Sequence, residues 1–80
     1  MDPRAERLAT FIQQNVSRNP KRAIEPGTAL VSSGLVDSLS LIKVLTFIED
    51  EFNVVIPDEA ATADAMDTVD RIVGLMDRFA

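Results

Sequence analysis

The sequence predicts an all-α protein, a small four-helix bundle in which three longer helices and one short third helix pack around one core. Three segments carry apolar residues at the spacing of an α-helix, and no segment alternates apolar and polar residues for long enough to form a sheet. The chain of 80 residues has the length of one small domain, so we expect a single domain over residues 1–80.

The first helix is predicted from Pro3 to Ser17. Asp2 can cap its N-terminus, and proline suits the first helical position, where its missing amide hydrogen is not needed. Helical spacing then places four apolar side chains on one face: Leu8, Phe11, Ile12 and Val16. The pair Asn19-Pro20 ends the helix.

A long loop is predicted between the first two helices, because Pro26-Gly27 and Ser32–Gly34 interrupt the segment KRAIEPGTALVSSG. A loop of this length in a small domain is usually functional or packed on the core. Four apolar side chains are expected to attach it to the core: Ile24, Leu30, Val31 and Leu35.

The second helix is predicted from Ser38 to about Phe52. At about 100° per residue, five apolar side chains fall on one buried face: Leu41, Val44, Leu45, Ile48 and Phe52. Leu39 and Ile42 lie off this face, on a flank that also holds Ser38, Thr46 and Glu49. The pattern predicts either an exposed apolar flank beside Ser38 or a helix that is buried on most of its sides.

The last third of the chain is predicted to hold the short helix and the last longer one. Asn53–Asp58 is expected to be an extended connection that turns at Pro57. Asp58–Ala65, DEAATADA, is predicted to form one or two helical turns. Asp67 or Thr68 caps the last helix. The apolar face of that helix is Val69, Ile72, Val73, Met76 and Phe79.

Charge is unevenly distributed along the chain, whose net charge is −5. Residues 1–36 carry five basic and three acidic side chains, whereas residues 37–80 carry three basic and ten acidic ones. An acidic half argues against nucleic acid or an anionic membrane as the partner and favours a protein with a basic surface. The alternative is an acidic face that serves solubility alone.

Membrane and export segments are not expected. No apolar run approaches the roughly 20 residues that span a bilayer, and the N-terminus lacks the continuous apolar stretch of a signal peptide. The chain has no cysteine, which fits a reducing compartment and excludes disulfides and thiolate zinc sites. We therefore expect a cytoplasmic protein without stable membrane insertion.

Catalysis by this chain is not expected, because it holds no histidine and no cysteine. The sequence has no zinc-protease, nucleophile-elbow or phosphate-loop motif, so we predict neither an enzyme nor a metal site. Ser38 follows Asp37, whose carboxylate can cap the helix, so Ser38 falls on the first turn with its hydroxyl outward. The free amides and dipole at this helix end favour a phosphodiester on Ser38. The alternative is an ordinary helix residue.

The stretch Gly34–Glu59, GLVDSLSLIKVLTFIEDEFNVVIPDE, resembles the central part of an acyl carrier protein. The shared features are the triplet Asp37–Leu39 at the helix start, the acidic cluster Glu49–Phe52 and the turn Ile56–Asp58. Met66–Met76, MDTVDRIVGLM, resembles the last helix of that family. The resemblance covers nearly the whole chain.

The resemblance implies that Ser38 is esterified by 4′-phosphopantetheine from coenzyme A, in a reaction of a separate Mg²⁺-dependent phosphopantetheinyl transferase. The thiol of this group then carries acyl groups as thioesters between enzymes of fatty-acid, lipid or polyketide synthesis. Asp37 and Leu39 are implied to flank the attachment site, with Asp37 as helix cap and transferase contact. The flank expected to meet basic docking surfaces of acyl-loading and acyl-processing enzymes is Leu39, Ile42, Lys43, Thr46 and Glu49. We expect a monomer.

The sequence departs from the general carriers of fatty-acid synthesis at Lys43, where glutamate is common. The string SGLVDSL is more similar to carriers that are dedicated to one pathway. The Gly-Gly pair of peptidyl carriers is missing before Ser38. An aminoacyl, D-alanyl or peptidyl carrier is therefore the second interpretation, and an unmodified helical adaptor for a basic protein surface is the third.

Overall fold

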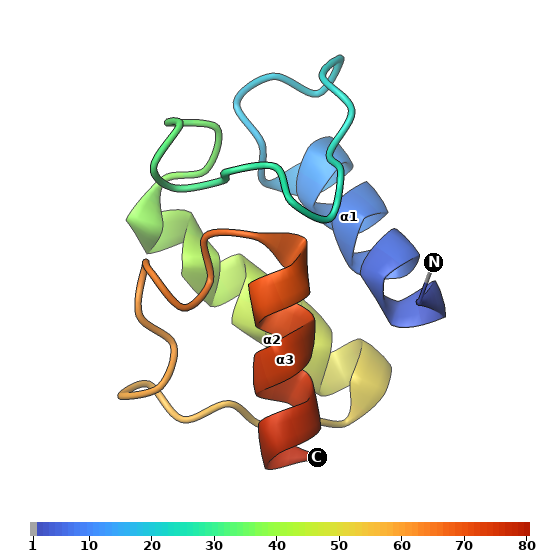
Figure 1. The fold of residues 1–80 in the computed structure, drawn as a ribbon, viewed down its shortest axis with the longest axis vertical. Coiled ribbons are helices and arrows are strands. Elements are labelled where there is room, and N and C mark those ends of the chain that lie inside the picture. The colour runs from blue at the N-terminus through green and yellow to red at the C-terminus, as the bar shows by residue number, and fades with distance from the viewer. Residues whose placement is uncertain (1) are drawn as a thin grey trace.

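The computed structural model describes residues 2–80 and contains three α-helices and one short 3₁₀ helix in this range. In chain order these are α1 (Pro3–Asn15), the 3₁₀ helix η1 (Ser38–Ser40), α2 (Leu41–Phe52) and α3 (Val69–Phe79) (Figure 1). No strand occurs among residues 2–80, so the predicted all-α class is confirmed. The described chain measures 31 × 25 × 20 Å.

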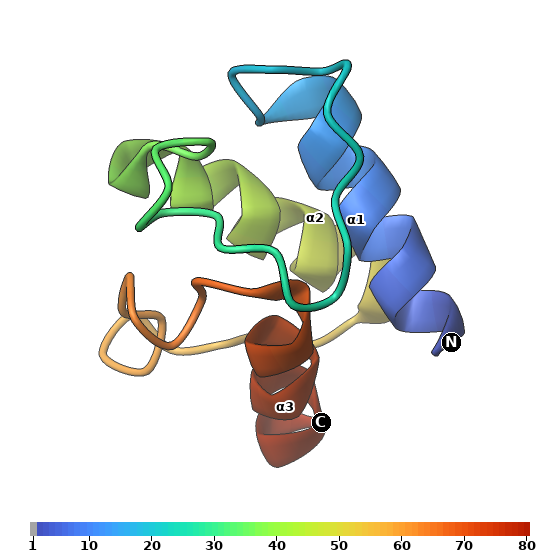
Figure 2. The ribbon, with the colours of Figure 1, turned by 45° about the horizontal axis from the view of Figure 1, so that its top comes forward.

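One core is built from the three α-helices and the two connections around them. The loop between α1 and α2 runs beside α1 to the N-terminal end of α3 and then returns to η1 (Figures 1 and 2). Two backbone hydrogen bonds hold it there, from the Leu30 amide to the Asp67 carbonyl at 2.7 Å and from Asp70 to Pro26 at 3.0 Å. The largest fully buried side chains are Leu8, Ile12, Leu30, Val36, Val44, Ile48, Met66, Val69, Ile72 and Met76.

α1 begins as predicted and ends at Asn15 rather than at Ser17. The Asp2 carboxylate caps it by accepting a hydrogen bond from the Arg4 amide at 2.8 Å. At Val16 the backbone φ of −123° departs from helical geometry, which explains the earlier end. Two side chains of the predicted apolar face are buried, Leu8 and Ile12, and two are half-buried, Phe11 and Val16.

The long loop is packed on the core, as its apolar residues predicted. Ile24, Leu30 and Leu35 are buried and Val31 is half-buried. Val36 is buried as well and was not predicted. The loop turns at Gly34, whose φ of +82° is a left-handed conformation that glycine adopts without steric cost.

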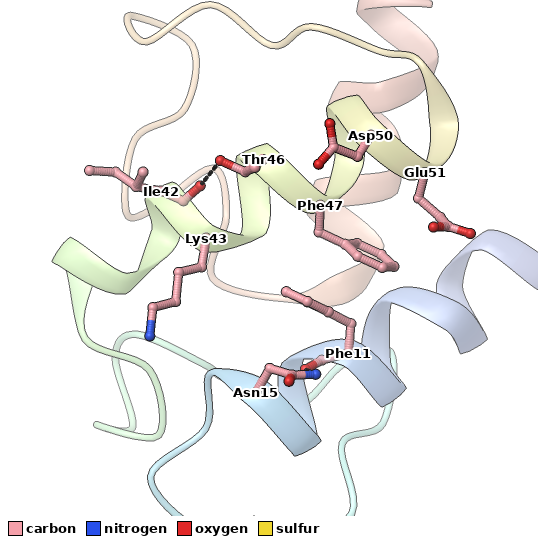
Figure 3. Close-up of a pocket in the computed structure, with 8 residues that line it drawn as sticks. All are labelled: Phe11, Asn15, Ile42, Lys43, Thr46, Phe47, Asp50 and Glu51. Carbon is pink, nitrogen blue, oxygen red and sulfur yellow. Dashed lines mark hydrogen bonds between the residues drawn. The ribbon is translucent and has the colours of Figure 1, made fainter.

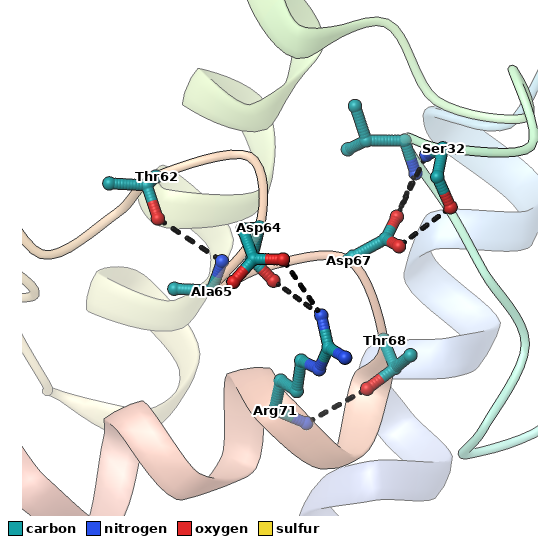
Figure 4. A network of polar contacts seen from close by, with 8 residues as sticks. Ser32, Thr62, Asp64, Ala65, Asp67, Thr68 and Arg71 are labelled. Carbon is teal, nitrogen blue, oxygen red and sulfur yellow. Dashed lines mark hydrogen bonds and ion pairs between the residues drawn. The ribbon is translucent and has the colours of Figure 1, made fainter.

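The Asp67 carboxylate, which lies just before α3, also holds this loop. Its Oδ1 accepts hydrogen bonds from the amides of Val31 and Ser32 at 2.7 and 2.8 Å, and its Oδ2 accepts from the Ser32 hydroxyl at 2.7 Å (Figure 4). These bonds, first of all the one from the Ser32 amide, lower the pKa of Asp67 because they stabilise the ionised carboxylate. The carboxylate therefore joins two segments that are far apart in sequence.

Asp67→Asn is expected to destabilise the protein at neutral pH but not at low pH. The pKa of Asp67 is lowered on folding, so its charge contributes stability above the ordinary value of 3.8, and this contribution is lost as pH falls through the folded value. The loss at pH 7 should be about 1 kcal/mol, since asparagine keeps one of the two acceptor oxygens. Urea unfolding at pH 7 and at a pH below the folded pKa of Asp67, which itself lies below 3.8, measures it.

The matched control is Asp64→Asn, which removes an exposed carboxylate that pairs with Arg71 at 3.3 Å. This variant should lose less stability than Asp67→Asn at pH 7. A loss for Asp67→Asn that is the same at both pH values would contradict a role for the charge.

α2 begins at Leu41 rather than at Ser38, because the preceding residues form η1. In η1 the Ser40 amide donates to the Asp37 carbonyl at 2.9 Å, the shorter hydrogen-bond spacing of a 3₁₀ turn. The predicted buried face is confirmed: Leu41, Val44 and Ile48 are buried, and Leu45 and Phe52 are half-buried. Asn53 ends α2 in a left-handed conformation with a φ of 58°.

The short third helix predicted over Asp58–Ala65 is replaced by turns. The amides of Ala60 and Ala61 both donate to the Pro57 carbonyl, at 2.9 and 3.2 Å, and no helix continues from them. A helix of one or two turns must offset a costly first turn by packing, and this segment offers mainly small alanine side chains for that purpose. The predicted four-helix bundle is therefore not confirmed, since residues 2–80 form three α-helices.

α3 is capped by Thr68, one of the two predicted caps. The Thr68 hydroxyl accepts a hydrogen bond from the Arg71 amide at 3.1 Å (Figure 4). On its predicted face Val69, Ile72 and Met76 are buried and Val73 and Phe79 are half-buried. Leu75 is buried too and was not predicted. None of the helices in residues 2–80 has the length and apolar character that crossing a membrane requires.

Candidate functional site

Ser38 lies exposed at the point where the long loop joins α2, as the first residue of η1. Val36 precedes it and is buried, with its amide donating to the Leu30 carbonyl at 2.9 Å. Leu41 follows it and is buried as well. Both anchors belong to the core, so the exposed turn between them holds the Ser38 hydroxyl at a defined place on the surface.

Asp37 is the N-cap of η1, in agreement with the cap predicted at this position. Its Oδ1 accepts a hydrogen bond from the Leu39 amide at 2.9 Å, and its Oδ2 lies 3.5 Å from Nη2 of Arg18. The side chains of Arg18 and Asp37 are 69% and 43% exposed. Their ion pair is therefore worth only about 0.2–1 kcal/mol, but it places a cation beside the residue that precedes Ser38.

Leu39 and Ile42 are exposed, at 77% and 66%, so the flank beside Ser38 is open and α2 is not buried on most of its sides. Val55 is a third large apolar side chain on the surface, 64% exposed, and was not predicted. A sequence signal for it exists. Val54 and Ile56 are buried, and an extended segment turns alternate side chains to opposite sides, so Val55 must point outward.

A groove of about 350 Å³ lies between α2 and the segment that follows it. It brings together three residues of the predicted flank, a neighbouring leucine on α2 and side chains of the segment that follows α2. Its lining is Ile42, Leu45, Thr46, Glu49, Val55, Ile56 and Asp58. The groove therefore has apolar walls and two carboxylates at its rim, and it starts one helical turn after Ser38.

A second groove, of about 570 Å³, lies on the other side of α2, between α2 and α1 (Figure 3). Phe11 and Phe47 face each other there and stack, with ring centroids 4.1 Å apart. This contact explains why Phe47 lies off the buried face of α2. The complete lining is Phe11, Asn15, Ile42, Lys43, Thr46, Phe47, Asp50 and Glu51.

The predicted partner-binding flank is thus divided between two grooves. Ile42 and Thr46 line both of them, and the Thr46 hydroxyl donates to the Ile42 carbonyl at 3.0 Å (Figure 3). Glu49 lines only the groove next to Val55, whereas Lys43 lines only the aromatic one. Lys43 and Glu49 therefore border different surfaces, in agreement with their spacing, which puts them about 120° apart around the helix.

Within residues 2–80 no group of three or more acidic side chains is arranged to hold a metal ion. The groups around Ser38 are one capping carboxylate, one guanidinium and exposed apolar side chains.

Residues 6–76 match the sequence model of a family described as phosphopantetheine attachment site. The fold is similar to that of a chain in the crystal structure of an FAD-dependent dehydrogenase, with 24% identity and a TM-score of 0.72 over 85% of this chain and 96% of that chain.

Two further similar chains come from crystal structures of the Bradyrhizobium japonicum glycine:[carrier protein] ligase. In the complex with glycylated carrier protein, the identity is 20% and the TM-score 0.65 over 89% of this chain and 90% of that chain. In the complex with cognate carrier protein and an analogue of glycyl adenylate, the values are 19% and 0.68 over 92% and 91%. At these identities the likeness concerns the fold alone.

Proposed function

We propose that this chain, which belongs to the phosphopantetheine attachment-site family, is a carrier protein that receives its arm on Ser38. The family carries 4′-phosphopantetheine as a covalently attached cofactor. When bound, this group supplies a thiol that holds cargo as a thioester. The observation that carries the proposal is the exposed Ser38 hydroxyl, which lies on a turn that Asp37 caps and that is flanked by buried Val36 and Leu41.

The chain's part in the attachment is to present the hydroxyl, and a phosphopantetheinyl transferase supplies the catalysis. Ser38 Oγ forms a bond to the phosphorus that carries the pantetheine of coenzyme A. The pyrophosphate bond breaks, adenosine 3′,5′-bisphosphate leaves, and the serine proton passes to a base of the transferase. A chain without histidine and cysteine has no evident base of its own for this step, so we propose that it is not itself an enzyme.

Intact-mass spectrometry tests this function. The protein is incubated with coenzyme A, Mg²⁺ and a broad-specificity phosphopantetheinyl transferase, and its mass is measured before and after. Addition of one 4′-phosphopantetheine supports a carrier. An unchanged mass, with a known carrier modified in the same tube, would contradict it and would favour an unmodified helical adaptor.

The proposed cargo is an acyl group, and the proposed docking surface is the apolar flank beside Ser38. Leu39, Ile42 and Val55 are exposed there, and exposed apolar side chains rimmed by polar ones are typical of contact surfaces. Glu49 and Asp58 line the groove that Ile42 and Val55 also line, so their negative charges complement the basic side chains of a partner that docks there. Fatty-acid, lipid or polyketide synthesis would supply such partners.

An aminoacyl cargo is the second candidate. Two chains of similar fold come from complexes of a glycine:[carrier protein] ligase, one of them the complex with glycylated carrier protein. The loading reaction distinguishes the two cargoes. Modified protein is offered either malonyl coenzyme A with a malonyl transferase, or glycine with ATP and a glycine:[carrier protein] ligase, and the mass of the product identifies the cargo.

Lys43→Glu is expected to accelerate loading by a general malonyl transferase a few-fold at low salt. Lys43 is exposed and lines the aromatic groove, beside Ile42 and Thr46. Its positive charge would repel the basic side chains of a partner that docks on this flank. An exposed charge pair is worth about 0.2–1 kcal/mol, which limits the effect to about fivefold. Initial loading rates at low and at high salt measure it, and the difference should shrink at high salt.

Lys21→Glu is the matched control, because it makes the same charge change in the exposed part of the long loop. Its loading rate should change less than that of Lys43→Glu. Equal rates for wild type and Lys43→Glu at low salt would remove Lys43 from the specificity elements.

A further inference from the structure

Asp37 has both carboxylate oxygens engaged, each by a different part of the chain. Oδ1 accepts from the Leu39 amide at 2.9 Å and caps η1, whereas Oδ2 lies 3.5 Å from Arg18 Nη2. The cap fixes the carboxylate, since turning it away would leave the Leu39 amide without this acceptor. A charge added to Ser38 would therefore stand beside a carboxylate that has a fixed position.

Arg18 is attached to this site through its backbone as well as its side chain. Its amide donates to the Leu35 carbonyl at 2.8 Å. Val36, which follows Leu35 in the chain, is buried. The Arg18 side chain is 69% exposed, so it can reorient while its backbone stays beside the turn. A guanidinium has several N–H donors in one plane and can contact two anions at once.

A phosphodiester on Ser38 would create a pair of neighbouring anions. Adjacent residues have Cα atoms about 3.8 Å apart, so the phosphate charge would repel the carboxylate of Asp37. The carboxylate already has Arg18 as its ion-pair partner. Arginine also suits phosphate oxygens, because its donors match their geometry.

We infer that Arg18 is the intramolecular counter-ion of the modified site, bridging the Asp37 carboxylate and the phosphodiester on Ser38. This inference rests on the proposed modification of Ser38. Arg18 acts as a positioning residue: it pairs with Asp37 before modification, and it holds the base of the arm against η1 afterwards. Attachment of the arm therefore recruits a residue from the segment that follows α1.

A cycle of four proteins tests the inference: wild type and Arg18→Gln, each before and after attachment of phosphopantetheine. Thermal midpoints are measured at low and at high salt. Modification should lower the midpoint of Arg18→Gln by about 1–8 °C more than that of wild type at low salt. High salt should close this gap, because it screens exposed charges.

Two further variants and a spectrum separate a counter-ion from a general structural effect. Arg18→Lys keeps the charge and should restore part of the difference, whereas Arg22→Gln removes an exposed loop charge and should behave as wild type. In wild type, the NMR signal of the Arg18 side-chain Nε–H should shift on modification.

The remaining outcomes overturn either the role of Arg18 alone or the carrier function together with it. Equal effects of modification on wild type and Arg18→Gln, or an equal loss in Arg22→Gln, overturn the role of Arg18 while the carrier function stands. An unchanged mass after treatment with the transferase overturns both the carrier function and the counter-ion.

Discussion

Ser38→Ala is expected to leave a folded protein that accepts no phosphopantetheine. Ser38 is exposed and its backbone, not its hydroxyl, takes part in η1, so alanine removes the acceptor oxygen without opening a cavity. Substitutions at such surface positions usually change the free energy of unfolding by no more than about 0.5 kcal/mol. Intact mass after incubation with coenzyme A and transferase should therefore show complete loss of modification, whereas the urea midpoint stays close to that of wild type.

Ser40→Ala is the matched control for this experiment. Ser40 lies in the same 3₁₀ helix, two positions after Ser38, and is half-buried. It should be modified as wild type is. Modification of Ser38→Ala, at Ser40 or elsewhere, would mean that the attachment residue is assigned wrongly. Loss of modification in both variants would point to a disturbed turn rather than to a missing acceptor.

Helix N-caps and helix faces could be predicted from the sequence because local chemistry determines them. Asp2 and Thr68 cap α1 and α3 through hydrogen bonds to amides two and three residues ahead, so the signal lies within one turn. The same holds for Asp37 and the Leu39 amide. The buried face of α2 follows from its apolar spacing, and the exposure of Ile42 agrees with the predicted flank.

The remaining features depend on contacts between distant segments, which no local pattern contains. The Asp67 carboxylate binds Val31 and Ser32 from more than thirty residues away. The ion pair of Arg18 with Asp37 likewise joins the segment after α1 to the N-cap of η1. Such contacts require knowledge of how the long loop folds back, so the sequence alone predicted the Asp37 cap on the Ser38 turn but not the ion pair of Asp37 with Arg18.

The prediction of a short helix over Asp58–Ala65 was wrong for a related reason. The alanines of this segment favour a helix, but propensity alone does not stabilise one or two turns in water. Tertiary packing would have to supply the difference, but no side chain of Asp58–Ala65 is buried, and only Ala60, Ala61 and Ala65 are half-buried.

Ile48→Ala is expected to give the largest loss of stability among the variants considered. Ile48 lies in the middle of α2 and is 0% exposed, so the truncation leaves a cavity among side chains of the core. Such truncations cost about 2–5 kcal/mol, a large part of the roughly 5–15 kcal/mol that stabilises a typical domain. Urea unfolding followed by circular dichroism measures the change, with the slope checked for two-state behaviour.

Ile42→Ala is the control that makes this experiment specific to burial. It is the same substitution on the same helix, and both variants gain the same small amount of helix propensity from alanine. Ile42 is 66% exposed, so its loss should be within about 0.5 kcal/mol of wild type. The difference between the two variants therefore reports the packing of Ile48 alone. Equal losses would mean that the face of α2 assigned to the core is wrong, and the flank assigned to partners beside Ser38 would be wrong with it.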